Sequence, residues 1–419
     1  MSNGPLSMKQ NIIWNSIGSV IYLGCQWLMS ILIVRLSNGY ENAGIFSLAM
    51  SIGNLFTPFA IYRMRAYQVS DTYKRYSSSQ YAAFRIATIA IAFIGCELYT
   101  YFTCNENAWP AITLYLLYKG IECFIDVLHG VDQRHLRMDI IGKSFIIRGL
   151  LTICSFSMAL HFSKNLEIAL ISIILVTAPV LFFYDYPSAK QFDKVRPAIS
   201  RSDTIRLLTK CLPAVAASIA CSAVLTIPRQ YLAVTQGDAA LGIYASIASP
   251  VALVQMGGSY VYSPLLGSLA DTYNRNGRQS FTRLFFKSII GVLGACLVCC
   301  IGILLCGEKL FALLYGPSIV NHLYLLPPML ACAILTAILW FLNDLLLGIR
   351  DYYGSFFGNA SAIIVALLSA FLLIDTFGMN GISYTGIIAY TIGIAASLVS
   401  LIIDLKHSDR KTPKKECHE

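Results

Sequence analysis

Long apolar segments recur along the whole chain, and they constrain its fold more than any other feature. A helix needs about 20 predominantly apolar residues to cross the hydrocarbon core of a bilayer, which is about 30 Å thick. Because 56% of the residues are hydrophobic and only 13% are charged, a soluble fold of this size could not cover its apolar surface. The sequence therefore predicts an all-α integral membrane protein with about twelve transmembrane helices. The predicted spans lie near residues 11–34, 43–62, 82–103, 109–131, 144–162, 167–185, 207–227, 240–265, 285–306, 323–347, 356–377 and 381–403.

Three short motifs recur in the same order in the two halves of the chain. In the clearest pair, residues 71–75 read Asp-Thr-Tyr-Lys-Arg and residues 271–275 read Asp-Thr-Tyr-Asn-Arg. One such match arises easily by chance, whereas three in one order indicate a duplicated membrane unit. The three pairs are 43–47 with 241–245, 71–75 with 271–275, and 126–130 with 344–348.

The duplication divides the predicted spans into two groups of about six and indicates how the halves are related. Because an even number of spans returns the chain to the same side, the repeat is parallel, with its pseudo-twofold axis along the membrane normal. The predicted fold is two six-helix lobes around a central cavity. Residues 1–195 would form the N-terminal lobe, 196–405 the C-terminal lobe and 406–419 a basic cytoplasmic tail.

Lysine and arginine residues gather in alternate loops. The positive-inside rule places such loops in the cytoplasm, so both termini are expected there. This asymmetry accounts for the net charge of +9 without nucleic-acid binding. The cation-rich loops lie near residues 63–75, 134–143, 190–201 and 275–283.

One predicted span, residues 109–131, carries a polar face. Its polar residues follow one another at steps of four, three, four and three residues, which keeps them on one side of a helix. Charged groups at bilayer depth are costly unless they are paired or hydrated. The face therefore lines a cavity, which we favour, or forms a structural ladder in which Lys119 pairs with Glu122. The five residues are Tyr115, Lys119, Glu122, Asp126 and His129.

Three acidic residues are candidates for ion coupling. Glu122 and Asp126 lie on this polar face, and Asp344 occupies the place of Asp126 in the second half. A carboxylate at membrane depth can bind a proton or a sodium ion. Because Asp126 and Asp344 both lie near a cytoplasmic helix end, ordinary solvation there is the competing interpretation.

Four cations are candidates for substrate binding: Arg35, Lys119, Arg148 and Arg229. Arg148 either reaches back to lipid headgroups or points into the cavity. Arg35 and Arg229 end the first and seventh predicted spans, at equivalent places in the repeat, and they either meet the substrate or only anchor helix ends. Because guanidinium groups bind phosphate through two parallel hydrogen bonds, this set predicts an anionic substrate.

Motifs for catalysis are absent from the sequence, which contains no G-x-S-x-G elbow, no P-loop and no H-E-x-x-H motif. Cys296 and Cys299 have metal-ligand spacing, but no histidine or acidic residue lies near them in the sequence. Neither a metal nor a cofactor is therefore expected. The chain is predicted to be a transporter rather than an enzyme, driven by an ion gradient or by the substrate itself.

A set of motifs lies within the first 90 residues, at Asn11–Ser19, Gln26–Trp27, Arg35–Leu36, Arg65–Asp71, Tyr76, Tyr81 and Arg85. In these motifs the chain resembles the Wzx-type lipid-linked oligosaccharide flippases, which act in polysaccharide biosynthesis. Those flippases belong to the multidrug/oligosaccharidyl-lipid/polysaccharide (MOP) superfamily, together with the MATE transporters. The likeness is clearest over these first 90 residues.

This resemblance implies a cationic cavity between two six-helix lobes and transport by alternating access. It implies that the protein moves undecaprenyl-diphosphate-linked oligosaccharide across the bacterial cytoplasmic membrane, for biosynthesis of O-antigen (lipopolysaccharide), capsule or exopolysaccharide. A monomer that works beside a polysaccharide polymerase and is coupled to H⁺ or Na⁺ would fit. One alternative is a MATE-like drug/cation antiporter, which would prefer an acidic cavity. Another is an integral-membrane polysaccharide polymerase, which would expose a large catalytic outer loop.

Overall fold

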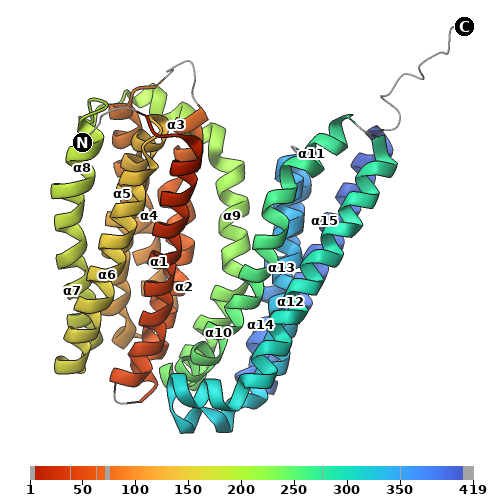
Figure 1. Cartoon of the computed structure of the whole chain (residues 1–419). Helices are drawn as coiled ribbons and strands as arrows, with labels where there is room; N and C mark the ends of the chain where they lie inside the picture. The colour runs from red at the N-terminus through yellow and green to blue at the C-terminus, as the bar shows by residue number, and fades with distance from the viewer. Residues whose placement is uncertain are drawn as a thin grey trace, which may run out of the picture. The chain divides into compact units, whose positions relative to one another are not determined.

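The structure, a computed structural model, describes residues 5–37, 39–62, 64–70, 76–275, 277–349 and 351–408. All regular secondary structure in these ranges is helical (Figure 1). The first half contains α1 (Met8–Leu36), α2 (Glu41–Ile61), α3 (Met64–Ser70), α4 (Ser78–Thr103), α5 (Trp109–Arg134), α6 (Met138–Ser163), α7 (Leu166–Val180) and α8 (Tyr186–Lys190). The second half contains α9 (Arg201–Gln236), α10 (Asp238–Tyr262), α11 (Leu266–Arg275), α12 (Gly277–Tyr315), α13 (Leu326–Gly348), α14 (Tyr352–Phe377) and α15 (Asn380–Ser408).

Each of the predicted spans coincides with a long helix, so the predicted all-α membrane fold is confirmed. Ten helical stretches in the described ranges are long and apolar enough to cross a membrane. The two long helices outside this group are α5 and α9. In α5 the reason is its charged face, since Lys119, Glu122 and Asp126 follow within eight positions of one another. A helix with such a face must be covered by other helices rather than by lipid.

The contacts between residues divide the chain into two compact units, which are described separately. Unit 1 comprises residues 1–222 and 232–246, and unit 2 comprises residues 223–231 and 247–419. The six long helices of the first half all belong to unit 1, as do residues 201–222 and 232–236 of α9 and residues 238–246 of α10. The predicted lobe boundary at residues 195 and 196 and the central cavity remain predictions.

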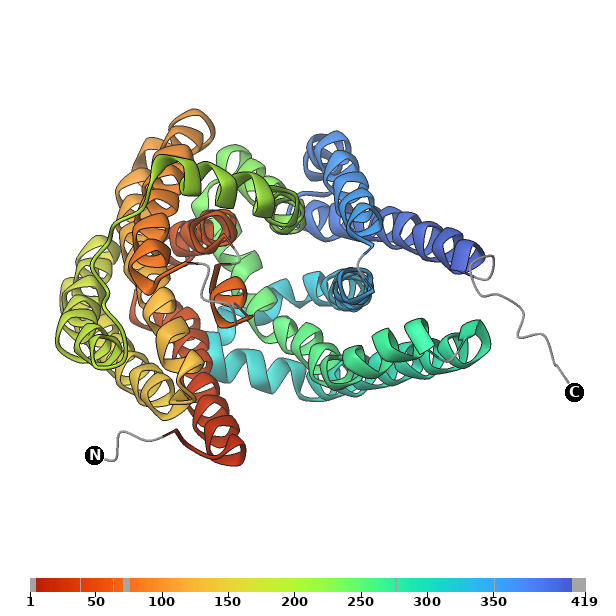
Figure 2. The ribbon, with the colours of Figure 1, turned by 90° about the horizontal axis from the view of Figure 1, so that it is seen from above.

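In unit 1, α1 packs along α6, and α5 is surrounded by α2, α4, α6 and α7. Figure 2 shows α1, in red, running beside α6, in yellow. Glycine makes the α1–α6 contact close: a Cβ added to Gly18 would stand 2.5 Å from the Cα of Gly142. Small residues let membrane helices approach in this way. The polar face of α5 is thus enclosed by helices of its own unit.

Unit 2 shows a similar close contact between α14 and α15. A Cβ added to Gly393 of α15 would stand 2.9 Å from the carbonyl oxygen of Gly358 in α14. Next to it, Ser355 and Asn359 of α14 donate hydrogen bonds to the side-chain oxygen of Asn343 in α13, at 2.6 and 2.8 Å. These contacts tie the three helices α13, α14 and α15 together.

A glycine in the left-handed region separates the first two helices of each half. Gly39 has φ 97° between α1 and α2, and Gly237 has φ 87° between α9 and α10. Such angles favour glycine. The offset between them is 237 − 39 = 198 residues, the same as between Gly44 and Gly242 in the repeated motif, 242 − 44 = 198. Residues 71–75, the first member of a second motif pair, lie outside the described residues.

Candidate functional site

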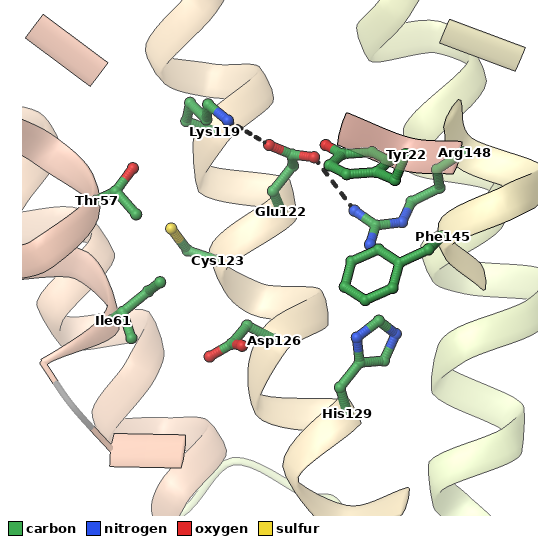
Figure 3. Close-up of a pocket in the computed structure, with 10 residues that line it drawn as sticks. All are labelled: Tyr22, Thr57, Ile61, Lys119, Glu122, Cys123, Asp126, His129, Phe145 and Arg148. Carbon is green, nitrogen blue, oxygen red and sulfur yellow. Dashed lines mark hydrogen bonds and ion pairs between the residues drawn. The ribbon is translucent and has the colours of Figure 1, made fainter. Parts of the chain in front are cut away.

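A cavity of about 160 Å³ lies within unit 1, against the polar face of α5 (Figure 3). Four of the predicted site residues line it, namely Lys119, Glu122, Asp126 and Arg148. The face therefore borders a cavity, as we favoured, and α1, α2 and α6 complete the wall. The remaining lining residues are Tyr22, Thr57, Ile61, Cys123, His129 and Phe145.

Glu122 is held between two cations. The Lys119 ammonium lies 2.7 Å from its Oε2, and Nη1 of Arg148 lies 3.3 Å from its Oε1. The hydroxyl of Tyr118 also donates to Oε1, at 3.0 Å. Figure 3 shows Lys119 and Arg148 on opposite sides of the carboxylate. The pair of Lys119 with Glu122, which belonged to the competing ladder interpretation, is therefore present as well, on a face that also lines the cavity.

Arg148 projects from α6 into the cavity and is only 3% exposed. Its guanidinium carbon lies 5.1 Å from the ring centroid of Tyr22 and 5.2 Å from that of Phe145. Nε donates to the hydroxyl of Ser144 at 3.3 Å. A cation between two aromatic rings is stabilised by their electron-rich faces. This placement matches the prediction that Arg148 points into the cavity and excludes the prediction that it reaches for headgroups.

Asp126 also bridges two cations, but they come from other helices. Its Oδ1 lies 3.1 Å from Nη1 of Arg65 in α3, and its Oδ2 lies 3.1 Å from Nη2 of Arg85 in α4. The Arg85 side chain is fully buried. Arg65 donates a further hydrogen bond to Gln133 at 3.0 Å. Asp126 thus fastens α3 and α4 to α5.

Sequence reasoning missed the roles of Arg65 and Arg85. Arg65 was counted among the loop cations, and Arg85 was used only for the resemblance. The signal for Arg85 was present, because an arginine within the apolar segment 82–103 must find a partner at membrane depth. Nothing in the sequence could pair it with Asp126, which lies 41 positions away.

Two cations and two carboxylates line this cavity, and two further arginines that do not line it contact one of the carboxylates. Lys119 and Arg148 contact Glu122, while Arg65 and Arg85 contact Asp126. Four cations around two carboxylates leave a formal surplus of 4 − 2 = +2. His129, which also lines the cavity, contacts Asp185 through its Nε2 at 3.1 Å.

The other predicted site residues lie away from this cavity. Arg35 is exposed in the last turn of α1. Arg229 belongs to unit 2, and α9 continues past it to Gln236, so it does not end its helix as predicted. The 198-residue offset pairs Arg35 with Ala233, which corrects the predicted equivalence of the two arginines.

Asp344 lies in α13 of unit 2, and its Oδ2 accepts a hydrogen bond from the hydroxyl of Tyr262 at 3.0 Å. Asp126 belongs to unit 1, so the predicted opposition of Asp126 and Asp344 remains a prediction. Across the described residues, no group of three or more histidine, cysteine or acidic side chains is arranged to hold a metal ion.

The chain resembles known proteins in both sequence and fold. No family model matches the chain. A curated relative, the capsular polysaccharide biosynthesis protein CapF of Staphylococcus aureus, is 24% identical over 386 residues, which cover 90% of this chain and 95% of the relative. The similarity therefore runs through both halves rather than through the N-terminal motifs alone.

Solved structures show the same fold. An inward-facing MATE-family multidrug transporter of the MOP superfamily matches with a TM-score of 0.72, at 14% identity over 96% of this chain and all of that one. The lipid II flippase MurJ matches with a TM-score of 0.65, at 11% identity over 94% of this chain and 89% of that one. The MATE multidrug transporter DinF-BH matches with a TM-score of 0.63, at 14% identity over 94% of this chain and 95% of that one.

The fold and the comparisons define the class: the chain is a multi-pass membrane protein with the fold of MOP-superfamily transporters. Within that class, the similarity to CapF confirms the resemblance to the polysaccharide-biosynthesis branch that the N-terminal motifs indicated. The structural neighbours are transporters and flippases.

Proposed function

We propose that this protein is a flippase for undecaprenyl-diphosphate-linked oligosaccharide, which it moves from the cytoplasmic to the outer leaflet by alternating access. The observation that carries the proposal is the surplus of two positive charges in the ion-pair clusters of Glu122 and Asp126, the two carboxylates that line the cavity of unit 1. A diphosphate bears negative charge of matching size. Fixed cations in a partly buried site attract it far more strongly than they would in water.

The size of the cavity favours the diphosphate over the sugars as its occupant. The cavity volume of about 160 Å³ is well below the roughly 300–1,000 Å³ of sites that enclose a whole drug-sized ligand. That room suits a diphosphate group and is too small for an oligosaccharide. The sugars would occupy a larger space outside this cavity, and the polyprenyl chain would stay in the bilayer.

Lys119 and Arg148 are the cations best placed for this role, because both line the cavity directly. Both cations form ion pairs with Glu122 in this structure, so an entering diphosphate would replace the Glu122 carboxylate as their partner. Arg65 and Arg85 contact Asp126 and do not line the cavity, so they would add positive charge without touching the diphosphate. Arg35 and Arg229 remain candidates for the outer mouth of the pathway.

A MATE-like drug/cation antiporter is the second candidate, since several of the structural neighbours are multidrug transporters. A cationic drug would need a free carboxylate in the cavity. Both carboxylates of the cavity wall are already engaged, each by two cations. The chemistry of the site therefore favours an anionic substrate over a cationic drug.

The proposed function is carried out in the bacterial cytoplasmic membrane, with both termini in the cytoplasm and a polysaccharide polymerase acting on the product.

Complementation of a flippase-deficient strain tests the proposal, with surface polysaccharide measured at equal membrane abundance. The wild-type chain should restore the polysaccharide and Arg148→Ala should not. The control is Arg206→Ala, which removes an exposed arginine of α9. Failure of the wild-type chain in a strain with matching glycan would contradict the proposal.

A further inference from the structure

Three titratable side chains lie buried together near the C-terminal end of α5. His129 and Asp132 come from α5, and Asp185 comes from the π-helical turn Leu181–Asp185 between α7 and α8. Their exposed fractions are 1%, 0% and 0%. His129 Nε2 lies 3.1 Å from Asp185 Oδ1. Because His129 and Asp132 are three residues apart, they share one face of the helix.

Asp132 differs from the carboxylates of the cavity wall. Neither of its oxygens has a hydrogen-bond partner among the described residues, and the same holds for Oδ2 of Asp185. Glu122 and Asp126, in contrast, each contact two cations. A carboxylate that is buried without hydrogen bonds is costly as an anion, and it binds a proton or another cation instead.

Among the described residues, no cation forms a salt bridge with Asp132, so it lacks a dedicated counter-ion. The negative charges of Asp185 and Asp139 disfavour an ionised Asp132, whereas the positive charges of Arg137 and Arg65 favour it. Arg137, however, is held by Asp139 at 2.8 Å.

The remaining cations of this region are engaged in the same way. Arg65 is held by Asp126 at 3.1 Å, and Lys143 lies 3.7 Å from Asp139. Arg148, which also acts on His129, contacts Glu122. Within the described part of the chain, Asp132 and Asp185 are thus two buried, mutually repelling carboxylates with one histidine and no dedicated cation, an arrangement that favours binding of a proton.

The π-turn supports a role beyond packing. It interrupts the regular hydrogen bonding between α7 and α8 at the residue that contacts His129, and Pro187 in the next turn cannot donate a backbone hydrogen bond. Turns of this kind occur mostly as single insertions in helices and are frequent at functional sites. Here the turn presents Asp185 to α5.

We propose that Asp132, Asp185 and His129 form a buried proton-binding site that couples proton movement to transport. The coupling role rests on the proposed flippase function. His129 connects the two sites, because it lines the cavity and also contacts Asp185. A proton arriving from the cavity reaches His129 first and then the carboxylate pair. Coupling thus belongs to Asp132 and Asp185 rather than to Glu122 and Asp126, whose oxygens are occupied by cations.

Infrared spectroscopy of the purified protein in lipid nanodiscs tests the proton site without any substrate. The wild-type protein should show the carbonyl stretch of a protonated carboxylic acid, and the band should disappear on raising the pH. Asp132→Asn should remove this band, while the control Glu106→Gln, an exposed carboxylate just before α5, should keep it. A band that survives in Asp132→Asn overturns the proposal. So does a band that excess Na⁺ abolishes at constant pH, because the site would then bind sodium.

Asp132→Glu and a transport measurement separate coupling from folding. Asp132→Glu keeps an ionisable carboxyl group and should retain the band and the wild-type melting temperature. In proteoliposomes, a pH gradient should accelerate flipping by the wild type and by Asp132→Glu but not by Asp132→Asn. An undiminished response in Asp132→Asn would overturn the coupling role. If the wild-type protein moved no lipid-linked oligosaccharide, the flippase proposal would fail, while the infrared result would still decide the proton site.

Discussion

Gly44 of α2 and Gly242 of α10 pack backbone against backbone. A Cβ added to Gly242 would stand 2.9 Å from the backbone nitrogen of Gly44 and would overlap the carbonyl oxygen of Tyr40. A Cβ added to Gly44 would in turn overlap the carbonyl oxygen of Asp238. Positions 44 and 242 are equivalent in the repeat, and so are positions 40 and 238, because 242 − 44 and 238 − 40 are both 198. The contact is therefore reciprocal: each glycine approaches the carbonyl oxygen four residues before the other glycine. Reciprocal contacts of this kind are expected where two related elements meet at a twofold axis.

We expect Gly44→Ala and Gly242→Ala each to destabilise the protein by about 1–3 kcal/mol, because the added methyl group meets rigid backbone. Gly95→Ala is the matched control, since a Cβ there meets nothing within 4 Å. Thermal unfolding followed by size-exclusion chromatography in detergent measures the effect. Unchanged melting temperatures for both variants would show that the two helix starts do not depend on this contact.

The second prediction concerns Arg148. Arg148→Ala removes one of the two cations on Glu122 and empties the space between Tyr22 and Phe145. We expect it to abolish most transport, while Arg148→Lys keeps the positive charge and retains a substantial part. Lysine lacks the planar guanidinium that makes two parallel hydrogen bonds to a phosphate, and this difference accounts for the activity that Arg148→Lys loses. The measurement is surface polysaccharide at equal membrane abundance. Full activity of Arg148→Ala would leave Lys119 as the cation that lines the cavity and would weaken the cationic-site argument.

The third prediction concerns the buried ion pair of Arg85 with Asp126. Asp126→Asn leaves the fully buried Arg85 guanidinium without its counter-charge, and breaking a buried pair in this way costs about 3–5 kcal/mol. Replacing both residues, as in Arg85→Met with Asp126→Asn, should recover part of the loss, because no uncompensated charge remains on α4. Melting temperatures of the two single variants and the double variant form the test. If Asp126→Asn were as stable as the wild type, Arg65 and Arg85 would not depend on this carboxylate.

The sequence predicted the helices and the polar face of α5 because both follow from local periodicity. Apolar segments of membrane-spanning length identify helices whatever surrounds them, and the spacing from Lys119 to His129 places these residues on one side. The partners of Asp126 and His129 could not be predicted in this way. Arg65, Arg85 and Asp185 reach them only after α3, α4 and the π-turn have packed around α5.

The interpretation of Arg229 was wrong for a related reason. Its span was expected to end at the arginine, but α9 continues to Gln236 and ends before Gly237, whose positive φ closes the helix. The glycine was the better boundary signal, because its backbone conformation repeats in both halves. Charge marks a helix end only by tendency, whereas a left-handed residue terminates the helix directly.

The most direct test of the central claim is flipping by the purified protein. It would be reconstituted in liposomes that carry undecaprenyl-diphosphate-linked oligosaccharide with a labelled sugar, and the fraction of label reached by a membrane-impermeant enzyme would be followed over time. We expect the wild type to expose the inner-leaflet label, and Arg148→Ala to remain close to protein-free liposomes. Liposomes in which the wild-type protein leaves the lipid-linked oligosaccharide in place but exports a cationic dye would contradict the account and favour the antiporter.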